Sequence, residues 1–292
     1  MRAVVGTVRM VRFKNGHWPP LGARGTVEGM KVVVLVKHVP DVQSERRIDD
    51  GLLVRGEDDV LNEVDENAVE AAVALVEEAG GEVIAVTMGP EDAVDAVRRA
   101  LQMGADSGLH VCDEELAGTD ALGTARVLAA AVRRIGDVDL VLAGMSAADG
   151  DMGVVPAALA ADLNWPVLSV AAELSVADGA ATITRTVDRT DETLRAQLPA
   201  VVSVTDQVNE PRIPAFKAMM AARKKQVEEI DLAELGLADA VEADSGALLG
   251  RQGAGTAVRE AAEKPAREAG TVITDTGDAG QQLAHYLAKV MK

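Results

Sequence analysis

Residues 142–157, LAGMSAADGDMGVVPA, are the stretch around which the rest of the chain is organised. An apolar strand is predicted over residues 138–143, and a loop that contains three glycines separates it from a helix predicted over 154–163. Glycine permits the positive φ and the close backbone approach that ligand loops often need. A helix N-terminus offers free N–H groups and a positive dipole, which suit a phosphate. The stretch indicates either an α/β nucleotide site or an ordinary connection between a strand and a helix.

The spacing of the loop glycines excludes two standard phosphate-binding motifs. The loop matches neither the GxGxxG motif of a dinucleotide-binding fold nor the GxxxxGK[ST] motif of a phosphate loop. The loop also carries two acids, Asp149 and Asp151, which would repel a phosphate. We therefore expect these acids to cap the helix or to bind a ribose hydroxyl.

Composition limits the class of protein. Aromatic residues are only 2% of the 292, so the core must be aliphatic, which suits helices packed on a parallel sheet. The net charge of −18 argues against nucleic acid and anionic membranes as partners; it favours solubility, or attraction to basic partner surfaces. The single cysteine, Cys112, excludes a disulfide framework and fits a reducing compartment. With no apolar run of the ~18 residues of a membrane span, we expect a cytoplasmic protein without membrane insertion.

Residues 1–29 differ from the rest of the chain. They hold five basic residues and one acid, whereas residues 30–292 hold 24 basic and 46 acidic residues, a net charge of −22. Met30 then directly begins the first predicted strand. The segment is either an Arg-rich targeting sequence or upstream sequence with Met30 as the true start. We favour the second interpretation and expect a loosely ordered or non-native extension.

From Met30 the sequence alternates strands and helices. Strands are predicted over 31–38, 82–87, 108–112 and 138–143, and helices over 62–78, around 94–101, over 119–135 and 154–163. A polar hairpin with an Asp50-Gly51 turn interrupts the pattern at 49–60. This order predicts a three-layer α/β fold, a mostly parallel sheet with helices on both faces. Residues 37–41, 88–90 and 144–153 should therefore converge at the carboxyl ends of the strands, where such sheets bind ligands.

After residue 166 the pattern changes to short β-like runs. These runs, at 167–176, 181–187, 193–198 and 200–205, predict a β-hairpin extension of the sheet. A basic, Met-containing helix is predicted to start at residue 217. Residues 238–270 lack a long periodicity and are expected to form a linker. A short amphipathic helix at 280–292 completes this C-terminal arm and should dock elsewhere, since a lone helix of that length is marginal.

Seven segments, taken in order, resemble the β subunit of electron transfer flavoproteins. They are MKVVVLVKHVPD, LNEVDENAVEAA, VTMGP, ALQMGAD, VLAGMSAADGD, TLRAQLPAVVSV and NEPRIPAF, which together cover about residues 30–237. Any one segment is a weak signal, but seven in register are specific. The resemblance implies an adenine nucleotide alpha hydrolase-like fold and a heterodimer with an α subunit that holds the redox-active FAD. The β subunit holds AMP in most members and a second FAD in electron-bifurcating members.

The resemblance also implies a nucleotide site at matching positions of this chain. The cofactor-binding residues would be Leu35, Asn62, Glu63, Val64, Asp65, Met88, Gly144, Met145, Ser146, Ala147, Ala148, Asp149, Gly150, Asp151, Met152 and Gly153. Where the family usually has Thr-Gly-Gln, this chain has Met152-Gly153-Val154, so a hydroxyl and an amide for the phosphate are missing. Backbone N–H groups remain as phosphate donors, and the choice between AMP and FAD stays open.

A second matching segment is the family's recognition loop, with which the β subunit anchors to dehydrogenases. It comprises Arg212, Ile213, Pro214, Ala215, Phe216 and Lys217. The family inserts one apolar side chain, usually leucine, into the partner, and the aligned residue here is Phe216. We interpret Phe216 as an exposed anchor rather than a core residue. The basic residues at 217 and 223–225 form either a patch that steers an acidic partner or a solvated helix face.

Other chemistry finds little support in the sequence. His38, His110 and His285 have no carboxylate or cysteine at ligand spacing, so we interpret them as structural and assign no metal. Ser146 has no basic neighbour in sequence that would activate it as a nucleophile.

We therefore predict an electron carrier subunit without substrate turnover of its own. Electrons from acyl-CoA or related dehydrogenases, as in fatty acid oxidation, would reach FAD in the heterodimer and pass to a quinone reductase, with AMP bound structurally. One alternative is an electron-bifurcating-type subunit with its own FAD. Another is a stand-alone adenine-nucleotide-binding regulatory protein or an enzyme that cleaves an adenylate bond.

Overall fold

The computed structural model describes residues 29–44, 46–56, 58–241 and 248–260, and in the remainder 262, 265, 270, 272, 274, 275 and 277–291. The predicted N-terminal extension lies outside the described residues except for Gly29. The chain divides into two compact units, of which the first ends at Val258 and the second begins at Arg259.

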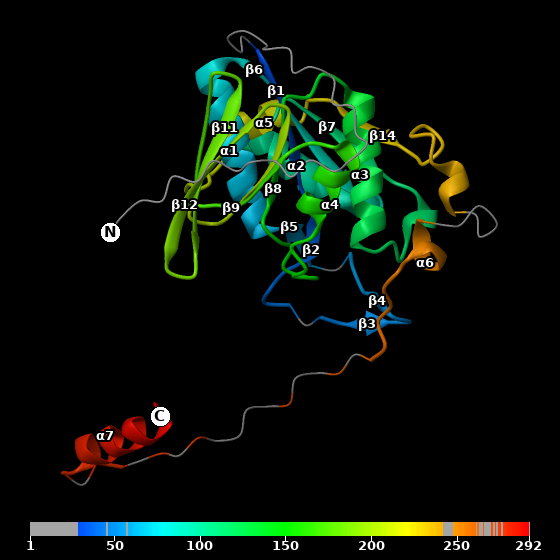
Figure 1. The fold of residues 1–292 in the computed structure, drawn as a ribbon. Coiled ribbons are helices and arrows are strands. Elements are labelled where there is room, and N and C mark those ends of the chain that lie inside the picture. The colour runs from blue at the N-terminus through cyan, green and yellow to red at the C-terminus, as the bar shows by residue number, and fades with distance from the viewer. Residues whose placement is uncertain are drawn as a thin grey trace, which may run out of the picture. The chain divides into compact units, whose positions relative to one another are not determined.

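The first unit is built on a parallel sheet that has seven strands among the described residues (Figure 1). Its order is β14 (Val227–Ile230), β7 (Ser107–Val111), β6 (Gly81–Met88), β1 (Met30–Leu35), β8 (Leu140–Gly144), β13 (Ala200–Val204) and β9 (Val167–Ala171). All six pairings between neighbours are parallel. Such a sheet is stable when both faces are covered, which explains the apolar runs of its strands.

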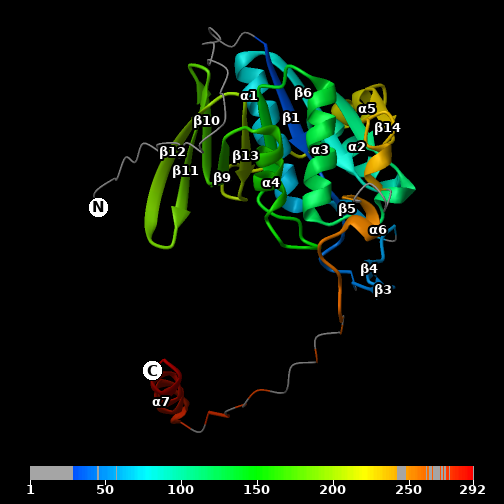
Figure 2. The ribbon, with the colours of Figure 1, turned by 45° about the vertical axis from the view of Figure 1, so that its right-hand side comes forward.

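Helices cover both faces of this sheet, as Figures 1 and 2 show. The helices are α1 (Glu63–Ala79), α2 (Val94–Met103) and α5 (Phe216–Ala222) on one face, and α3 (Ala121–Ile135) and α4 (Val155–Leu163) on the other. Alternate residues of β1 point to the two cores: Val32 and Val34 to the first, Val33 and Leu35 to the second. The predicted three-layer α/β fold is confirmed.

Two small hairpins follow β1. Strand β2 (His38–Pro40) pairs with β5 (Asp59–Leu61), and β3 (Ile48–Asp49) pairs with β4 (Leu52–Leu53), both antiparallel. The predicted Asp50-Gly51 turn lies between β3 and β4, and both residues have positive φ. The short helix η1 (Glu91–Ala93) follows β6.

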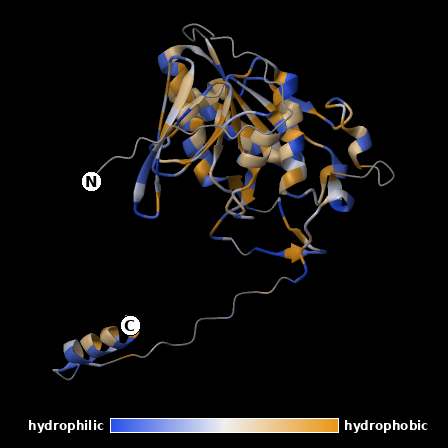
Figure 3. Ribbon diagram, in the orientation of Figure 1, coloured by the Kyte–Doolittle hydropathy of each residue, from blue (hydrophilic) through white to orange (hydrophobic). Residues whose placement is uncertain are grey.

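The predicted runs at 167–176 and 200–205 supply β9 and β13, which extend the main sheet as expected, whereas the hairpin between them belongs to a separate sheet. Strands β10 (Glu173–Ala177), β11 (Ala180–Val187) and β12 (Thr190–Gln197) form an antiparallel sheet beside β9 (Figure 2). The five residues of β13 are all buried, whereas exposed and half-buried residues alternate along β10 and β12. A strand whose residues alternate between exposed and half-buried suits a sheet with one solvent-exposed face. Figure 3 shows hydrophilic colour along this hairpin.

The C-terminal part contains η3 (Ala238–Val241), α6 (Gly250–Gly253) and α7 (Ala279–Val290). Within the segment expected as a linker, Leu249 is buried and the Gly250 amide donates to Thr119 Oγ1 over 2.7 Å. In the second unit, α7 is the predicted amphipathic helix, with Leu283, Leu287 and Val290 exposed. Across the described part of the chain, no helix combines the length and the apolar character that crossing a membrane requires.

Candidate functional site

The candidate site lies where the strand order of the main sheet reverses. The chain runs from β1 to β6 and β7 on one side, and then returns to β8 on the other side of β1. Open α/β sheets bind ligands outside the carboxyl ends of the strands at such a point. The predicted segments meet here: the end of β1, the start of α1, the end of β6 and the loop after β8.

Asp65 ties the ends of β1 and β8 together. Its Oδ2 accepts a hydrogen bond from the Lys37 amide over 2.9 Å, and its Oδ1 accepts one from the Gly144 amide over 3.2 Å. Burial raises the pKa of Asp65 to about 7, although hydrogen bonds from Asn62, Lys37 and Gly144 favour the charged form. A Cβ at Gly144 would lie 2.4 Å from Asp65 Oδ1, so the close approach of strand and helix requires glycine here.

Asn62 fixes the loop that follows β8. Its Nδ2 donates to the Ser146 carbonyl over 3.0 Å, and its Oδ1 accepts from the Ala148 amide over 3.0 Å. Asn62 precedes α1, but its buried side chain serves this distant loop and makes no capping bond to its own helix. The loop conformation is thus held by the first helix, through two residues that the resemblance had placed in the site.

The acidic character of the loop is offset by two basic side chains. Asp149 pairs with Lys37 Nζ over 2.9 Å and makes a short contact with Arg55 Nη2. Burial disfavours the charged form of Asp149, but Lys37 and Arg55 outweigh it and lower the pKa of the carboxyl. The charges of Lys37, Arg55 and Asp149 sum to +1, so the negative charge of Asp149 is offset, while Asp151 in the same loop is exposed. Asp149 also does not cap α4, whose N-terminus has no side-chain cap among the described residues.

Lys37 and Arg55 are functional candidates that sequence reasoning missed as individual residues. Lys37 lies in the segment 37–41 that topology placed at this edge, so its position was available from the sequence. Arg55 follows the β3–β4 hairpin and also donates from Nη1 to the His38 carbonyl over 2.8 Å. Since 94 residues separate Arg55 from Asp149, no local spacing indicates their pairing.

The remaining predicted positions differ in exposure. Leu35 is buried, Val64 and Met88 are half-buried, and Glu63, Gly150, Asp151 and Met152 are exposed, with 61% of Met152 accessible. Cys112, just beyond β7, is partly buried. Burial raises the pKa of its thiol, and Glu229 and Glu91 raise it further, so the thiol is a poor nucleophile at neutral pH.

The predicted docking segment begins at an anchored arginine. Arg212 bonds Glu70 through Nε and Glu77 through Nη1, each over 2.7 Å, and both glutamates lie on α1. The following apolar side chains point outward: Ile213 is 92% exposed and Phe216 is 74% exposed. The predicted exposure of Phe216 is confirmed, whereas its docking role stays a prediction.

Lys225 does not belong to the exposed basic patch that the sequence suggested. Its Nζ donates to the carbonyls of Leu101, Gly104 and Ala105, the shortest contact being 2.6 Å to Ala105. These carbonyls end α2, so Lys225 caps that helix from outside. The basic residues at 217, 223 and 224 remain exposed.

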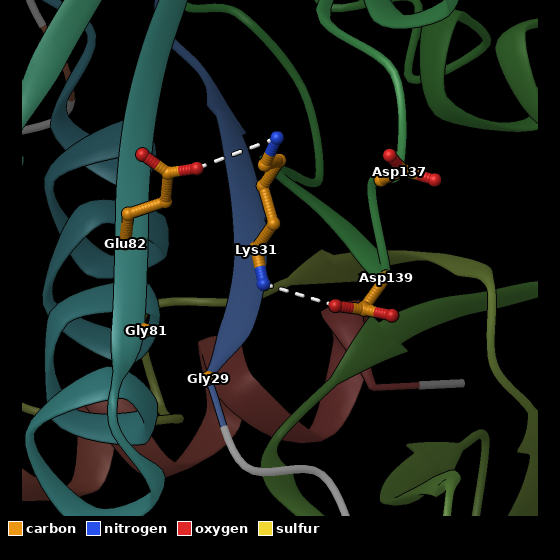
Figure 4. A pocket seen from close by; sticks show the side chains of 6 residues that line it. All are labelled: Gly29, Lys31, Gly81, Glu82, Asp137 and Asp139. Carbon is orange, nitrogen blue, oxygen red and sulfur yellow. Dashed lines mark hydrogen bonds and ion pairs between the residues drawn. The ribbon is translucent and has the colours of Figure 1, made fainter. Parts of the chain in front are cut away.

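A hollow of about 470 Å³ lies at the opposite, amino edge of the sheet, and Figure 4 shows its lining residues. Lys31 pairs with Glu82 over 3.4 Å, and its amide donates to Asp139 Oδ2 over 2.9 Å. Asp137 also lines the hollow, so three acids surround one lysine. Because ligands of parallel sheets bind at the carboxyl edge, this hollow is not the nucleotide site.

Comparison with known proteins gives consistent matches over this body. Residues 50–235 match the family described as "Electron transfer flavoprotein domain". The chain is 44% identical over 264 residues to electron transfer flavoprotein subunit beta of Mycobacterium leprae, covering 88% of this chain and 97% of that relative. The counterpart from Mycobacterium tuberculosis is 42% identical with the same coverage. Caffeyl-CoA reductase-Etf complex subunit CarD of Acetobacterium woodii is 33% identical over 251 residues, covering 85% and 93%.

Proposed function

The chain belongs to the electron transfer flavoprotein family as a β subunit, and from that premise we propose that it binds AMP at the carboxyl edge of β1 and β8. Its general role is electron transfer within a flavoprotein, and a β subunit implies an α-subunit partner. In the proposed heterodimer, the α subunit holds the redox-active FAD and AMP has a structural role. The heterodimer works in the cytoplasm.

The observation that carries the AMP proposal is the loop after β8. Asn62 and Asp65 hold its backbone from α1, while Lys37 and Arg55 balance the charge of Asp149. A preformed loop loses little conformational entropy when a ligand binds. The uncapped N-terminus of α4 presents backbone N–H groups that suit a phosphate in place of the missing hydroxyl and amide.

We propose that acyl-CoA or related dehydrogenases deliver electrons through contact with the docking segment. Ile213 and Phe216 are large exposed apolar side chains on a short stretch whose first residue is fixed to α1. Exposed apolar residues on a tethered segment fit the anchor of a transient interface. The reduced flavoprotein then passes its electrons to a quinone reductase.

The alternative with a specific observation behind it is a second FAD in the β site. One relative is named as a subunit of a caffeyl-CoA reductase-Etf complex, and Met152-Gly153-Val154 departs from the sequence expected for AMP. The stand-alone regulatory protein remains as a weaker alternative, because it gives no reason for the exposed docking segment.

Co-expression with the α subunit, followed by gel filtration and a nucleotide count, tests these proposals together. One flavin and one AMP per heterodimer is the expected result. Two flavins and no AMP would replace the proposal with the second-FAD alternative. A colourless chain that forms no heterodimer and binds ATP would refute the electron-carrier assignment in favour of the regulatory protein.

The docking proposal has its own test in the intact heterodimer. Replacing Phe216 by alanine should slow electron transfer from a reduced acyl-CoA dehydrogenase by roughly 10- to 100-fold at low partner concentration, the range of an interface hot spot. The matched control is Val187→Ala, an exposed apolar residue on β11, 41% accessible, which should leave the rate unchanged. Equal rates for the Phe216 variant and the wild type would refute the anchor role.

A further inference from the structure

Three side chains of metal-ligand type meet near the carboxyl ends of β1 and β6, although no histidine has a carboxylate or cysteine at ligand spacing in the sequence. They are His38 on β2, Asp59 on β5 and Asp92 on η1. One ligand atom from each lies within 4.8 Å of the other two, and His38 Nδ1 is 3.8 Å from Asp59 Oδ2. The pairing of β2 with β5 brings His38 and Asp59 together. Asp92 comes from η1, which follows β6, the neighbour of β1 in the main sheet.

Two of the converging atoms are buried without a hydrogen-bond partner. The side chain of His38 is 9% exposed and that of Asp59 is 4% exposed. Neither His38 Nδ1 nor Asp59 Oδ2 accepts or donates a hydrogen bond within the described part of the chain. A buried carboxylate oxygen without a partner is costly, and a second carboxylate nearby adds repulsion. A cation between the three groups would satisfy both unpaired atoms and offset the two negative charges.

We propose that His38, Asp59 and Asp92 bind one first-row divalent metal ion, with Zn²⁺ as the occupant. Imidazole nitrogen is a common ligand for zinc, copper, iron and nickel, whereas Mg²⁺ and Ca²⁺ prefer oxygen ligands alone. Ligands at ~2.0–2.1 Å from a tetrahedral zinc lie about 3.3 Å apart. The 3.8 Å separation of His38 Nδ1 and Asp59 Oδ2 needs only a small closure to reach that spacing. Three protein ligands leave a fourth position for water.

The ion joins segments that also support the nucleotide loop. The His38 carbonyl accepts a hydrogen bond from Arg55, and Arg55 pairs with Asp149 in the loop after β8. Metal binding at His38 therefore braces the strand whose His38 carbonyl accepts the hydrogen bond from Arg55. The site is separate from the nucleotide contacts, so its test does not depend on the identity of the nucleotide.

Zinc stoichiometry on the complete chain, purified with its α subunit, tests the proposal. After treatment with a chelator, the complex is dialysed against micromolar Zn²⁺ with millimolar Mg²⁺ present, and bound zinc is measured by elemental analysis. The wild type should bind one zinc more than the His38→Gln and Asp92→Asn variants. The control His285→Gln, a histidine on the exposed helix α7, should bind as much as the wild type. An anomalous difference map at the zinc edge should place the ion between the three side chains.

Thermal unfolding provides a second readout. At a zinc concentration 100-fold above the dissociation constant, the melting temperature of the wild type should rise by roughly 5–10 °C, and that of the His38 variant should not change. Asp92 is half-buried on a short helix, so Asp92→Asn keeps the test valid if a His38 variant does not fold. Equal zinc content in all variants, or displacement of the zinc by Mg²⁺, would overturn the proposal.

Discussion

Replacing Gly144 by alanine should destabilise the protein and disorder the loop that follows β8. Gly144 ends β8, and its φ is not in the left-handed region, so the backbone itself tolerates alanine. The obstacle is space: the new Cβ would lie 2.4 Å from Asp65 Oδ1 and 3.1 Å from the carbonyl carbon of Val64. Asp65 cannot turn aside without breaking its hydrogen bonds to the amides of Lys37 and Gly144.

The magnitude follows from two costs. Forcing a methyl group into a packed site costs about 1–3 kcal/mol, and leaving a buried hydrogen-bonding group unpaired costs about 1–3 kcal/mol. Replacing glycine by alanine also reduces the conformational entropy of the unfolded chain, which stabilises the folded protein by roughly 0.4–1 kcal/mol. We therefore expect the free energy of unfolding to fall by about 2–4 kcal/mol, which lowers the melting temperature by roughly 5–15 °C.

The matched control is Gly150→Ala in the same loop. No heavy atom lies within 4 Å of a Cβ built at Gly150, and its φ is also outside the left-handed region. Its stability should stay within about 0.5 kcal/mol of the wild type. Urea unfolding followed by circular dichroism measures stability, and calorimetric titration with AMP measures affinity. Gly144→Ala should weaken AMP binding by at least about tenfold, or 1.4 kcal/mol.

A double mutant separates the steric cause from other effects. If the clash with Asp65 dominates, combining Gly144→Ala with Asp65→Ala should cost less than the sum of the single variants. The reasoning would be refuted if the Gly144→Ala protein were as stable as the wild type. It would also be refuted if the stability loss of the double variant equalled the sum of the losses of the two single variants.

Three further predictions concern single side chains. Asp65 has a folded-state pKa of about 7 against about 4 in the unfolded chain, so its contribution to stability is complete below pH 4 and is lost as the pH rises through 7. Between pH 4 and 8, urea unfolding should show that the free energy of unfolding falls by up to about 1.4 kcal/mol per pH unit relative to the Asp65→Asn variant. Parallel plots of stability against pH for the two proteins would contradict this. Arg212→Lys removes the paired contacts with two glutamates of α1, so proteolysis after residue 212 should accelerate several-fold without a change in AMP affinity; unchanged cleavage would argue against the tether. Lys225→Met removes the cap of α2 and should cost about 1–2 kcal/mol in urea unfolding, whereas Lys224→Met, on the surface, should cost less than about 0.5 kcal/mol; equal costs would contradict the capping role.

The sequence was sufficient to predict the layered fold and the sheet edge at which we propose the nucleotide site. Most strands of the main sheet are largely apolar and the helices carry apolar stripes, so these elements are encoded locally. The edge strand β14, with the sequence VEEI, is not apolar and was not predicted. Parallel order then places the ends of β1, β6 and β8 at one edge. Strands β9 and β13 join the main sheet, as the predicted extension implies, whereas β10–β12 pair with one another in a separate sheet, because the sequence of a strand does not show which neighbour it pairs with.

Only the tertiary structure decided which polar groups meet. Arg55 reaches Asp149, Lys225 caps α2 and His38 faces Asp59 and Asp92, and each pair joins elements that are distant in the chain or belong to different layers. Hydrophobic periodicity is a local property that a sequence displays directly. A side-chain ion pair or a ligand cluster is fixed by the packing of several elements at once, and its partners leave no periodic trace along the chain.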